Sequence, residues 1–175
     1  MPDSTSAANS QPRASRPYMP GYQIADAEGG KGLLPWSWAA ERLSNAHNYW
    51  LSTTRPDGGP HVMAVWGVWL DETFIFSTAQ SSTKARNLAA DPRCVVCPER
   101  GDEAVVLEGV AEEVTDPALL RRFADAYNTK YDWDMDAAAG GIYAVRPSVA
   151  FGFIELPGDF PTTATRWTFH DEAEG

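Results

Sequence analysis

The sequence predicts a mainly β (α+β) fold: a barrel of about six to eight short antiparallel strands with two or three helices. Short runs rich in Val, Ile, Phe, Tyr and Trp recur along the chain, separated by turn residues such as Asp57-Gly58. Only a few segments carry the spacing of an amphipathic helix. No segment repeats at a fixed period. A sheet that closes on itself, with helical inserts, fits these three observations.

One domain accounts for the length of the chain. A chain of 175 residues can bury a substantial core, and we place the domain at residues 31–175. Residues 1–30 are rich in Ser, Ala, Pro and Gly and lack periodic apolar residues, so we expect a flexible tail there. Tyr18, Met19 and Tyr22 leave an alternative open, an arm that orders against a partner subunit.

Three strands are expected between residues 49 and 78. The runs YWLSTT, HVMAVWGVWL and TFIFST are joined by RPDGGP and by Asp71-Glu72, a pattern typical of an antiparallel meander. The middle run is apolar on both faces, whereas a half-solvated strand alternates with polar residues. One face should therefore lie inside the barrel, and the other should meet a second subunit, a helix or a ligand.

Three helices are predicted, one before these strands and two after them. Ser37 is the expected cap of the first. The segment SSTKARNLAADP predicts a second that ends before Pro92. Asp116-Pro117 starts a third, whose buried stripe consists of Leu119, Phe123 and Tyr127. The remaining strands are expected in RCVVCPE, EAVVLEGVAEEV, IYAVRP, VAFGFIEL and TATRWTF.

Composition excludes several classes of function. The net charge of −10 argues against binding of nucleic acid, which needs clustered Lys and Arg. No run approaches the roughly 18 apolar residues of a membrane helix, and residues 1–15 lack the apolar segment of a secretory signal. Two cysteines do not make a disulfide scaffold. We therefore expect a cytoplasmic protein with neither nucleic acid nor membrane as a partner.

A basic pair stands out in this acidic chain. Lys84 and Arg86 lie where the third strand ends and the second helix begins. Helix N-termini attract anions, and an ammonium and a guanidinium both bind phosphate. The pattern is consistent with a phosphate site, and equally with a solvated helix start that carries incidental charges.

No metal site is predicted. Cys94 and Cys97 point to opposite faces of a strand, and the chain offers no second pair of ligands at zinc spacing. The alternating Asp132, Asp134 and Asp136 lack the glycine and distal glutamate of a calcium-binding loop. Structural cysteines and a solvated acidic loop are the favoured interpretations.

Three other residues leave both a functional and a structural role open. His61 begins the middle strand, where it would bind a ligand or simply make a hydrogen bond at the sheet edge. Arg166 and Trp167 pair a guanidinium with a large ring on an otherwise apolar strand. The sequence carries no local signature of a Ser-His-Asp or Cys-His catalytic arrangement, and no phosphate-binding glycine loop of the P-loop or GxGxxG type.

The block from Leu51 to Val96 resembles the pyridoxamine 5′-phosphate oxidase-like superfamily of FMN-binding split β-barrels. It is most similar to the branch that contains flavin- and deazaflavin (F420)-dependent oxidoreductases. The resemblance extends over roughly residues 37 to 170. Its motifs are the PDGGPH turn, the TFIFST strand, the KARNLAADP run and the downstream YNTKYDW and TATRW segments.

The resemblance implies a split β-barrel and a homodimer with the cofactor in a groove between the subunits. It places Lys84 at the family's phosphate-binding lysine, with Arg86 and Asn87 beside it. The cofactor ring would lie along two strands, touching His61, Met63, Val65, Ser77 and Thr78. Arg166 and Trp167 match a strand that borders the cofactor or substrate pocket.

This chain departs from true pyridoxamine 5′-phosphate oxidases at the phosphate site. Those enzymes carry an Arg and a Lys on the second strand, where this chain has VMAVW, and an Arg-Lys pair where it has Thr83-Lys84. These differences favour F420 over FMN. We expect hydride transfer between the cofactor and a small unsaturated organic substrate, with His61 or Tyr127 as candidate proton donors. The alternatives are a non-catalytic protein that binds or stores a flavin, F420 or haem, and an oxidase of pyridoxamine 5′-phosphate.

Overall fold

The computed structural model describes residues 11–25, 32–137, 140–156 and 158–169. Within these residues it contains nine strands and four helices. The strands are β1 (Arg13–Ser15), β2 (Tyr49–Thr54), β3 (Pro60–Val65), β4 (Gly67–Leu70), β5 (Thr73–Ser77), β6 (Arg93–Pro98), β7 (Glu103–Glu113), β8 (Ile142–Ile154) and β9 (Thr165–Thr168). The helices are α1 (Trp36–Asn45), α2 (Thr83–Ala90), α3 (Pro117–Tyr131) and α4 (Phe160–Thr163).

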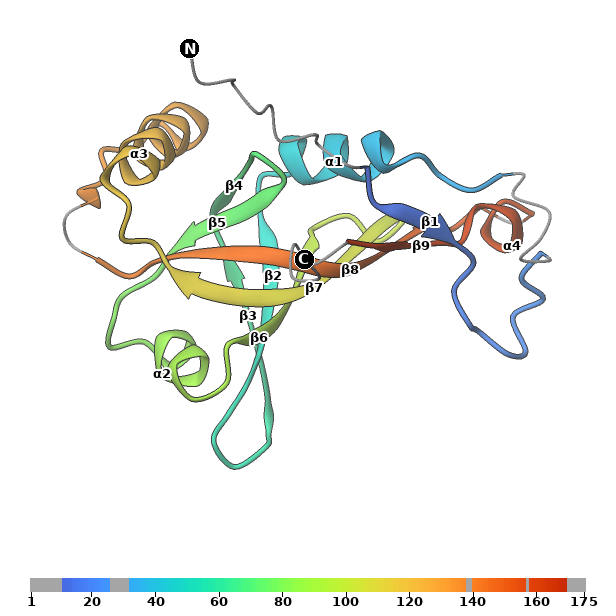
Figure 1. The fold of residues 1–175 in the computed structure, drawn as a ribbon, viewed down its shortest axis with the longest axis horizontal. Coiled ribbons are helices and arrows are strands. Elements are labelled where there is room, and N and C mark those ends of the chain that lie inside the picture. The colour runs from blue at the N-terminus through green and yellow to red at the C-terminus, as the bar shows by residue number, and fades with distance from the viewer. Residues whose placement is uncertain (1–10, 26–31, 138–139, 157, 170–175) are drawn as a thin grey trace, which may run out of the picture.

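All strand pairs are antiparallel, and they form one sheet in the order β1-β9-β8-β7-β6-β2-β3. The sheet branches at β8, which pairs with β7 on one side and with both β5 and β9 on the other. The first part of β8 takes β5, and β4 pairs with β5. Figure 1 shows the resulting open, split arrangement, with the β2–β3 hairpin reaching beyond the rest of the sheet. The predicted split-barrel α+β fold is confirmed.

β8 contains a bulge. It lies between the part of β8 that pairs with β5 and the part that pairs with β9. Opposite Glu108 and Gly109 of β7, the β8 partners are Val149 and Pro147, so Ser148 is the extra residue. Proline cannot donate to a ladder and is tolerated at bulges. A Cβ on Gly109 would lie 2.3 Å from the Arg146 carbonyl oxygen, so only glycine fits against the bulged strand.

The middle strand of the predicted meander is in fact two strands. β3 pairs with β2, but the chain leaves the ladder at Trp66 and continues as β4, which pairs with β5. Gly67 stands at the break, where a Cβ would lie 2.4 Å from the Phe74 ring and 2.8 Å from the Ile75 carbonyl oxygen. This close approach of two backbones explains why one apolar run serves two parts of the sheet.

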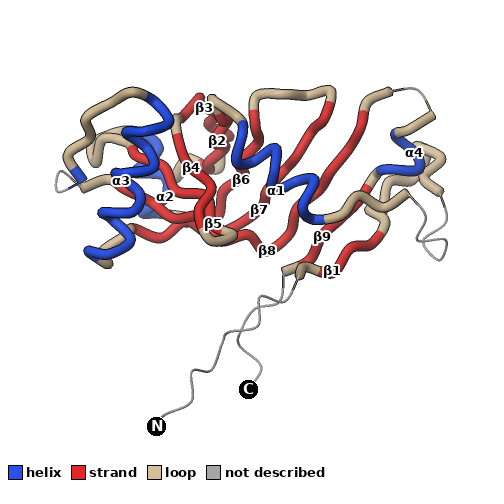
Figure 2. The backbone as a smooth tube through the Cα atoms, turned by 90° about the horizontal axis from the view of Figure 1, so that it is seen from above, coloured by secondary structure: helices blue, strands red, loops and turns tan. Residues whose placement is uncertain are grey.

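The helices lie around the sheet as Figure 2 shows, with α2 and α3 toward one end, α4 at the other and α1 between them. The Asp116 cap of α3 is confirmed, since its carboxylate accepts from the Ala118 and Leu119 N–H groups. The Ser37 cap of α1 is wrong. That helix begins two residues earlier than such a cap implies, at Trp36, and its N-cap Pro35 makes no side-chain hydrogen bond.

Two clusters of buried side chains form the core. The larger lies between α1 and the sheet and includes Leu43, Tyr49, Phe74 and Trp167. The smaller packs the apolar stripe of α3 against β4, β5 and β8, with Phe123, Tyr127 and Tyr131 facing Ile75. The second cluster therefore fixes α3 over the strand break at Trp66.

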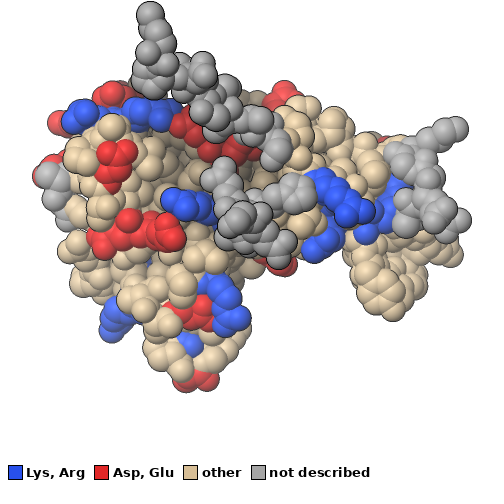
Figure 3. Space-filling view, viewed as in Figure 1, with Lys and Arg blue, Asp and Glu red and all other residues tan. Residues whose placement is uncertain are grey.

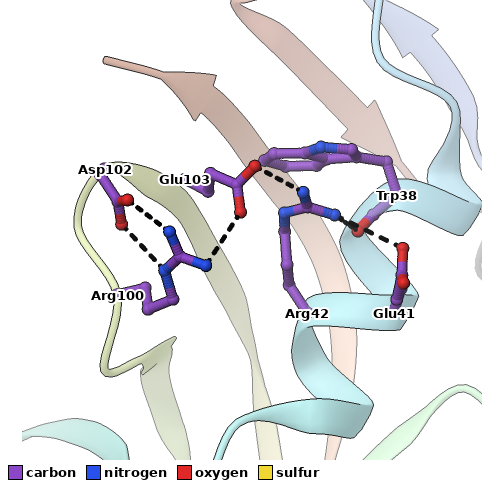
Figure 4. Close-up of polar contacts among 6 residues, drawn as sticks. All are labelled: Trp38, Glu41, Arg42, Arg100, Asp102 and Glu103. Atoms are coloured by element: carbon purple, nitrogen blue, oxygen red, sulfur yellow. Dashed lines mark hydrogen bonds and ion pairs between the residues drawn. The ribbon is translucent and has the colours of Figure 1, made fainter. Parts of the chain in front are cut away.

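Charged side chains hold α1 against the start of β7, as Figure 4 shows. The Arg42 guanidinium stacks 3.9 Å above the Trp38 ring and donates to Glu103 at 2.7 Å. Arg100, on the β6–β7 connection, pairs with Asp102 of the same connection and with Glu103, the first residue of β7. Because Arg42 is mostly buried, this group joins the helix to the sheet more firmly than a surface ion pair would.

The N-terminal segment contributes to the sheet. Within the tail predicted over residues 1–30, residues 13–15 form β1, whose Ala14 lies opposite Trp167 of β9. The edge of β9 offers unpaired backbone groups, which β1 satisfies. Residues 1–10 and 26–30 of the predicted tail lie outside the described residues. Among the helices that the structure describes, none is long and apolar enough to cross a bilayer.

Candidate functional site

A groove of about 320 Å³ opens where the strand break, the end of β5, the start of α2 and the helix α3 come together. Its walls combine apolar strand residues with polar side chains and one cation. The lining residues are Asn48, Ala64, Val65, Trp66, Ser77, Thr78, Lys84 and Tyr127. Of the predicted site residues, the fold therefore brings Val65, Ser77, Thr78, Lys84 and Tyr127 together.

Lys84 occupies the first turn of α2. The Ser82 hydroxyl caps this helix by accepting from the Ala85 N–H at 3.1 Å, and the Thr78 hydroxyl donates to Ser82 at 3.1 Å. The leading N–H groups of a helix have no intrahelical partner and favour anions. Lys84 is half-buried, and among the residues that the structure describes no carboxylate pairs with it.

More positive charge surrounds Lys84. Loss of water around the ring, together with the nearby cations Arg55 and Lys84, lowers the pKa of His61, so this imidazole is held neutral. Arg86 is exposed and donates to the Thr83 hydroxyl at 3.3 Å. On the lower left of Figure 3, over the end of the molecule that carries α2, Lys and Arg side chains lie among Asp and Glu side chains. Lys84 and Arg86, with Arg55 nearby, are the cations of this region that suit an anionic ligand.

Thr53 links two predicted site residues. Its hydroxyl accepts from the buried Asn87 amide at 2.9 Å and lies 3.4 Å from His61 Nδ1. Asn87 therefore faces the interior and positions Thr53, whereas the His61 ring lies at the sheet edge between Thr53 and the basic residues. Neither side chain lines the groove of the single chain.

The other predicted contacts lie elsewhere. Met63 is 48% exposed on the edge strand β3. Trp167 is fully buried in the core, edge to face with Trp36 at 5.4 Å, and Arg166 donates to Thr168 at 2.8 Å on the same strand. Trp167 therefore supports β9 from inside, and Arg166 is the member of this pair that a ligand can reach.

Trp66, Asn48 and Ala64 line the groove without having been singled out from the sequence. One signal was available for Trp66, since it belongs to the second apolar face of the run at residues 61–70. Asn48 carries no such signal, because it lies in the connection between α1 and β2 and reaches the groove only through the tertiary fold.

Tyr127 is the candidate acid that borders the groove. Burial raises the pKa of its phenol, so it stays protonated at neutral pH and is able to donate a proton or a hydrogen bond. His61 is set back from the groove, and because its pKa is lowered, little of the imidazole carries the extra proton at neutral pH, so it is the less suitable proton donor of the two.

A larger cavity of about 560 Å³ lies over β2, β6 and β7. Its one basic side chain, Arg93, is engaged by Asp91 at 2.6 Å, and Glu108 adds a further negative charge. The Lys84 groove is the better candidate for an anionic ligand because its cation has no such partner within the described residues. No cluster of three or more His, Cys, Asp or Glu side chains suited to a metal ion occurs in that part of the chain.

The donor set fits a phosphate-bearing ring cofactor. Lys84, Ser77 and Thr78 offer a cation and hydroxyl groups to the groove, and Ala64, Val65 and Trp66 offer apolar surface. Phosphate groups bind such donors at helix N-termini, and flat rings bury well against apolar and aromatic walls.

Comparison with known proteins identifies a family and similar structures. Residues 38–155 match the family described as pyridoxamine 5′-phosphate oxidase. An F420 reductase of known structure is 29% identical, with 63% of this chain and 93% of that one covered and a TM-score of 0.53. No curated protein matches the sequence.

Two more distant structures share the fold alone. A haem-binding protein from Mycobacterium smegmatis is 19% identical, with 72% of this chain and 57% of that one covered and a TM-score of 0.59. An FAD-binding protein from Mesorhizobium loti is 16% identical, with 78% and 96% covered and a TM-score of 0.56. The same architecture thus carries different cofactors.

Proposed function

This chain belongs to the pyridoxamine 5′-phosphate oxidase family, which it matches over more than half of its length, and on that premise we propose that it is a flavin- or deazaflavin-dependent oxidoreductase. It moves a hydride between the cofactor and a small unsaturated organic substrate. The observation that carries the proposal is Lys84, a half-buried ammonium beside an apolar groove with no carboxylate partner among the described residues.

Lys84 and Arg86 bind the anionic groups of the cofactor in this proposal. The ring lies along β3 and β5, where Val65, Ser77 and Thr78 border the groove. His61 and Met63 line the continuation of the same edge, with Asn87 holding Thr53 behind His61. Arg166, supported by Trp167, is assigned to the border of the site formed with a second subunit.

We favour F420 over FMN as the cofactor. β3 has the sequence PHVMAV and adds no second cation, and among the described residues that line the groove Lys84 is the single charged one. A phosphodiester carries one negative charge, which Lys84 alone balances, leaving Arg86 for the acidic tail of F420, whereas the terminal phosphate of FMN carries nearly two. The 29% identity to a protein named F420 reductase supports the same choice.

A homodimer completes the site in this proposal. The edge strand β3 leaves Val62 49% and Met63 48% exposed, next to the groove. A second subunit that covers this edge would remove the apolar side chains from water and wall the groove from outside. The composition and the two free cysteines are compatible with the cytoplasmic location that we propose.

The bound cofactor supplies the redox chemistry, namely a hydride with its two electrons. The chain orients the ring, excludes water and supplies charge. Reduction of the substrate also needs one proton, for which Tyr127 at the groove or water is the source, and the cofactor is left oxidised. Because the pKa of Tyr127 is raised, the phenol returns to its protonated form after each turnover.

One observation favours a second candidate, a protein that binds or stores a flavin, F420 or haem without catalysis. The two candidate proton donors do not lie together at the groove, as an acid–base pair would. Tyr127 lines the groove, whereas His61 lies outside it, beside Thr53. An oxidase of pyridoxamine 5′-phosphate is disfavoured by the absence of Arg and Lys from β3.

Reoxidation of bound, reduced cofactor separates these functions. Anaerobic protein loaded with reduced F420 or FMN is mixed with enones, quinones and a linear tetrapyrrole, and the cofactor absorbance is followed. The oxidoreductase predicts faster reoxidation with at least one acceptor than with buffer. Equal rates across the panel would identify a binder, and peroxide release from pyridoxamine 5′-phosphate would identify the oxidase.

A further inference from the structure

Trp66 has an unusual position in the groove. It lies at the break between β3 and β4, where it belongs to neither strand, and its half-buried side chain is part of the lining. Its ring stacks face to face on the Tyr131 ring, with centroids 4.5 Å apart and planes 6° from parallel. An indole in this setting presents a flat apolar surface whose orientation is set by the ring beneath it.

The ring beneath Trp66 is itself firmly held. The Tyr131 hydroxyl accepts from the Gly67 N–H at 2.9 Å and lies 2.8 Å from the His47 carbonyl oxygen, to which it can donate. Lys130 on the same helix donates to the Gly67 carbonyl at 2.9 Å and to the Tyr49 hydroxyl at 2.8 Å. These contacts fix both Tyr131 and the backbone on which Trp66 stands, so little side-chain entropy is lost when a ligand stacks there.

Other aromatic rings surround the indole. Tyr127 also lines the groove, and its ring lies 6.2 Å from Trp66. Trp133 approaches Trp66 edge-on at 6.1 Å and remains 59% exposed. The turn after α3, in which Asp132 has a positive φ and Asn128 accepts from the Met135 N–H, brings Trp133 back toward the groove. Exposed aromatic surface of this extent beside a groove indicates a ligand-binding role more than a packing one.

Charge narrows the class of ligand. Among the described residues that line the groove Lys84 is the single charged one, and it is assigned to the cofactor phosphate; Asn48 and the Tyr127 phenol remain as uncharged hydrogen-bonding groups. With Lys84 paired to the phosphate, these lining residues offer a second ligand no ionic partner. Neutral molecules with a carbonyl group are therefore matched.

We infer that Trp66 is a stacking platform that makes the enzyme selective for planar, fused-ring conjugated carbonyl compounds over single-ring ones. This inference rests on the proposed function, since the groove must also hold the cofactor. The selectivity comes from area: a fused second ring covers more of the Trp66 face, whereas a single ring leaves part of it in water.

Two fully substituted quinones test the inference: 2,3-dimethyl-1,4-naphthoquinone, with two fused rings, and duroquinone, with one. Substitution at every ring position adjacent to the carbonyls prevents addition of Cys94 or Cys97. Their dissociation constants are measured by calorimetry on the full-length protein, with and without oxidised cofactor. The variants are Trp66→Leu, Trp66→Phe and, as a control, Tyr22→Leu, which removes a ring that is 60% exposed beside Phe160 and α4.

Wild-type protein is expected to prefer the naphthoquinone. Trp66→Leu should weaken its binding about tenfold, the factor that corresponds to ~1.4 kcal/mol of lost stacking, and duroquinone less than about threefold. Trp66→Phe should retain most of the preference, and Tyr22→Leu should change neither constant. Equal losses for both quinones, or no preference in the wild type, would overturn the inference.

Failure of the proposed function gives a different result. If the naphthoquinone preference depends on Trp66 but no acceptor speeds reoxidation of the cofactor, the platform stands and the oxidoreductase does not. If reoxidation occurs and Trp66→Leu slows it equally with both quinones, the oxidoreductase stands and the platform does not.

Discussion

The Tyr131 hydroxyl accepts a hydrogen bond from the Gly67 backbone N–H across 2.9 Å, and so joins the last turn of α3 to the first residue of β4. The contact lies where one apolar run of the sequence changes sheet partners. It fixes the strand break, the stacked Trp66 ring and one wall of the groove at the same time.

Removal of this hydroxyl should weaken the fold. Tyr131→Phe leaves the buried Gly67 N–H without its acceptor, which costs about 1–3 kcal/mol of unfolding free energy. Urea denaturation followed by far-UV circular dichroism measures it. Tyr143→Phe is the matched control, because its hydroxyl makes no hydrogen bond within the described residues, and it should change stability by less than ~0.5 kcal/mol. Equal effects of the two substitutions would contradict the role assigned to the Tyr131 hydroxyl.

Gly67→Ala should be destabilising by steric overlap. The added Cβ would lie 2.4 Å from the Phe74 ring, so the two strands must separate, at a cost of about 1–3 kcal/mol. Gly101→Ala, at an exposed turn where a Cβ meets nothing within 4 Å, is the control and should be neutral or slightly stabilising. A Gly67→Ala protein as stable as the control would show that the break tolerates a side chain.

The stability of the fold should depend on pH through Lys130. Burial lowers the pKa of this ammonium to about 8, from an ordinary value of 10.5. Between these values the unfolded chain binds more protons than the folded one, so stability rises as the pH increases. Burial also raises the pKa of Tyr131 to about 12, from 10.0. Between these values the folded chain keeps a proton on Tyr131 that the unfolded chain has lost, so the stability of the fold decreases as the pH rises from 10 to 12.

Unfolding free energy measured from pH 7 to 10 tests this coupling. The wild type should gain stability above pH 8, whereas Lys130→Met should show a flatter profile because the titrating group is gone. Parallel profiles for the two proteins would exclude Lys130 as the source.

Local sequence features predicted most of the elements and part of the lining of the candidate groove. The Asp116 cap and the Phe123–Tyr127 stripe of α3 depend on neighbours in the chain, and both are present. Lys84 was found for the same reason, because a strand end, a capped helix start and a cation are all local.

Features that depend on distant contacts were not predictable in this way. Nothing near Trp66 in the sequence indicates that Tyr131, 65 positions later, supplies its stacking surface. Trp167 was expected at the pocket because its strand resembles one that borders the pocket in the family, yet neighbours in a strand point to opposite faces, and the tryptophan faces the core. Periodicity alone also missed the strand break, which is imposed by the packing of Gly67 against Phe74.

The exposed edge of β3 predicts a dimer in solution. Sedimentation equilibrium should give twice the 19.1 kDa mass of the chain. Val62→Asp and Met63→Asp place charges on side chains that are 49% and 48% exposed, and should shift the equilibrium toward the monomer without unfolding it. A monomeric wild type would remove the second subunit from the proposed site.

The central claim is that Lys84 binds the cofactor phosphate. Titration of the cofactor-free protein with F420 and with FMN, followed by fluorescence, tests it most directly. Lys84→Ala should weaken binding of the preferred cofactor by about 1–3 kcal/mol, the scale of a lost charge-assisted hydrogen bond. Arg13→Ala, which removes one exposed cation from β1, should leave affinity unchanged. We predict tight binding of F420 that depends on Lys84; equal affinities of the wild type and Lys84→Ala for both cofactors would contradict the account.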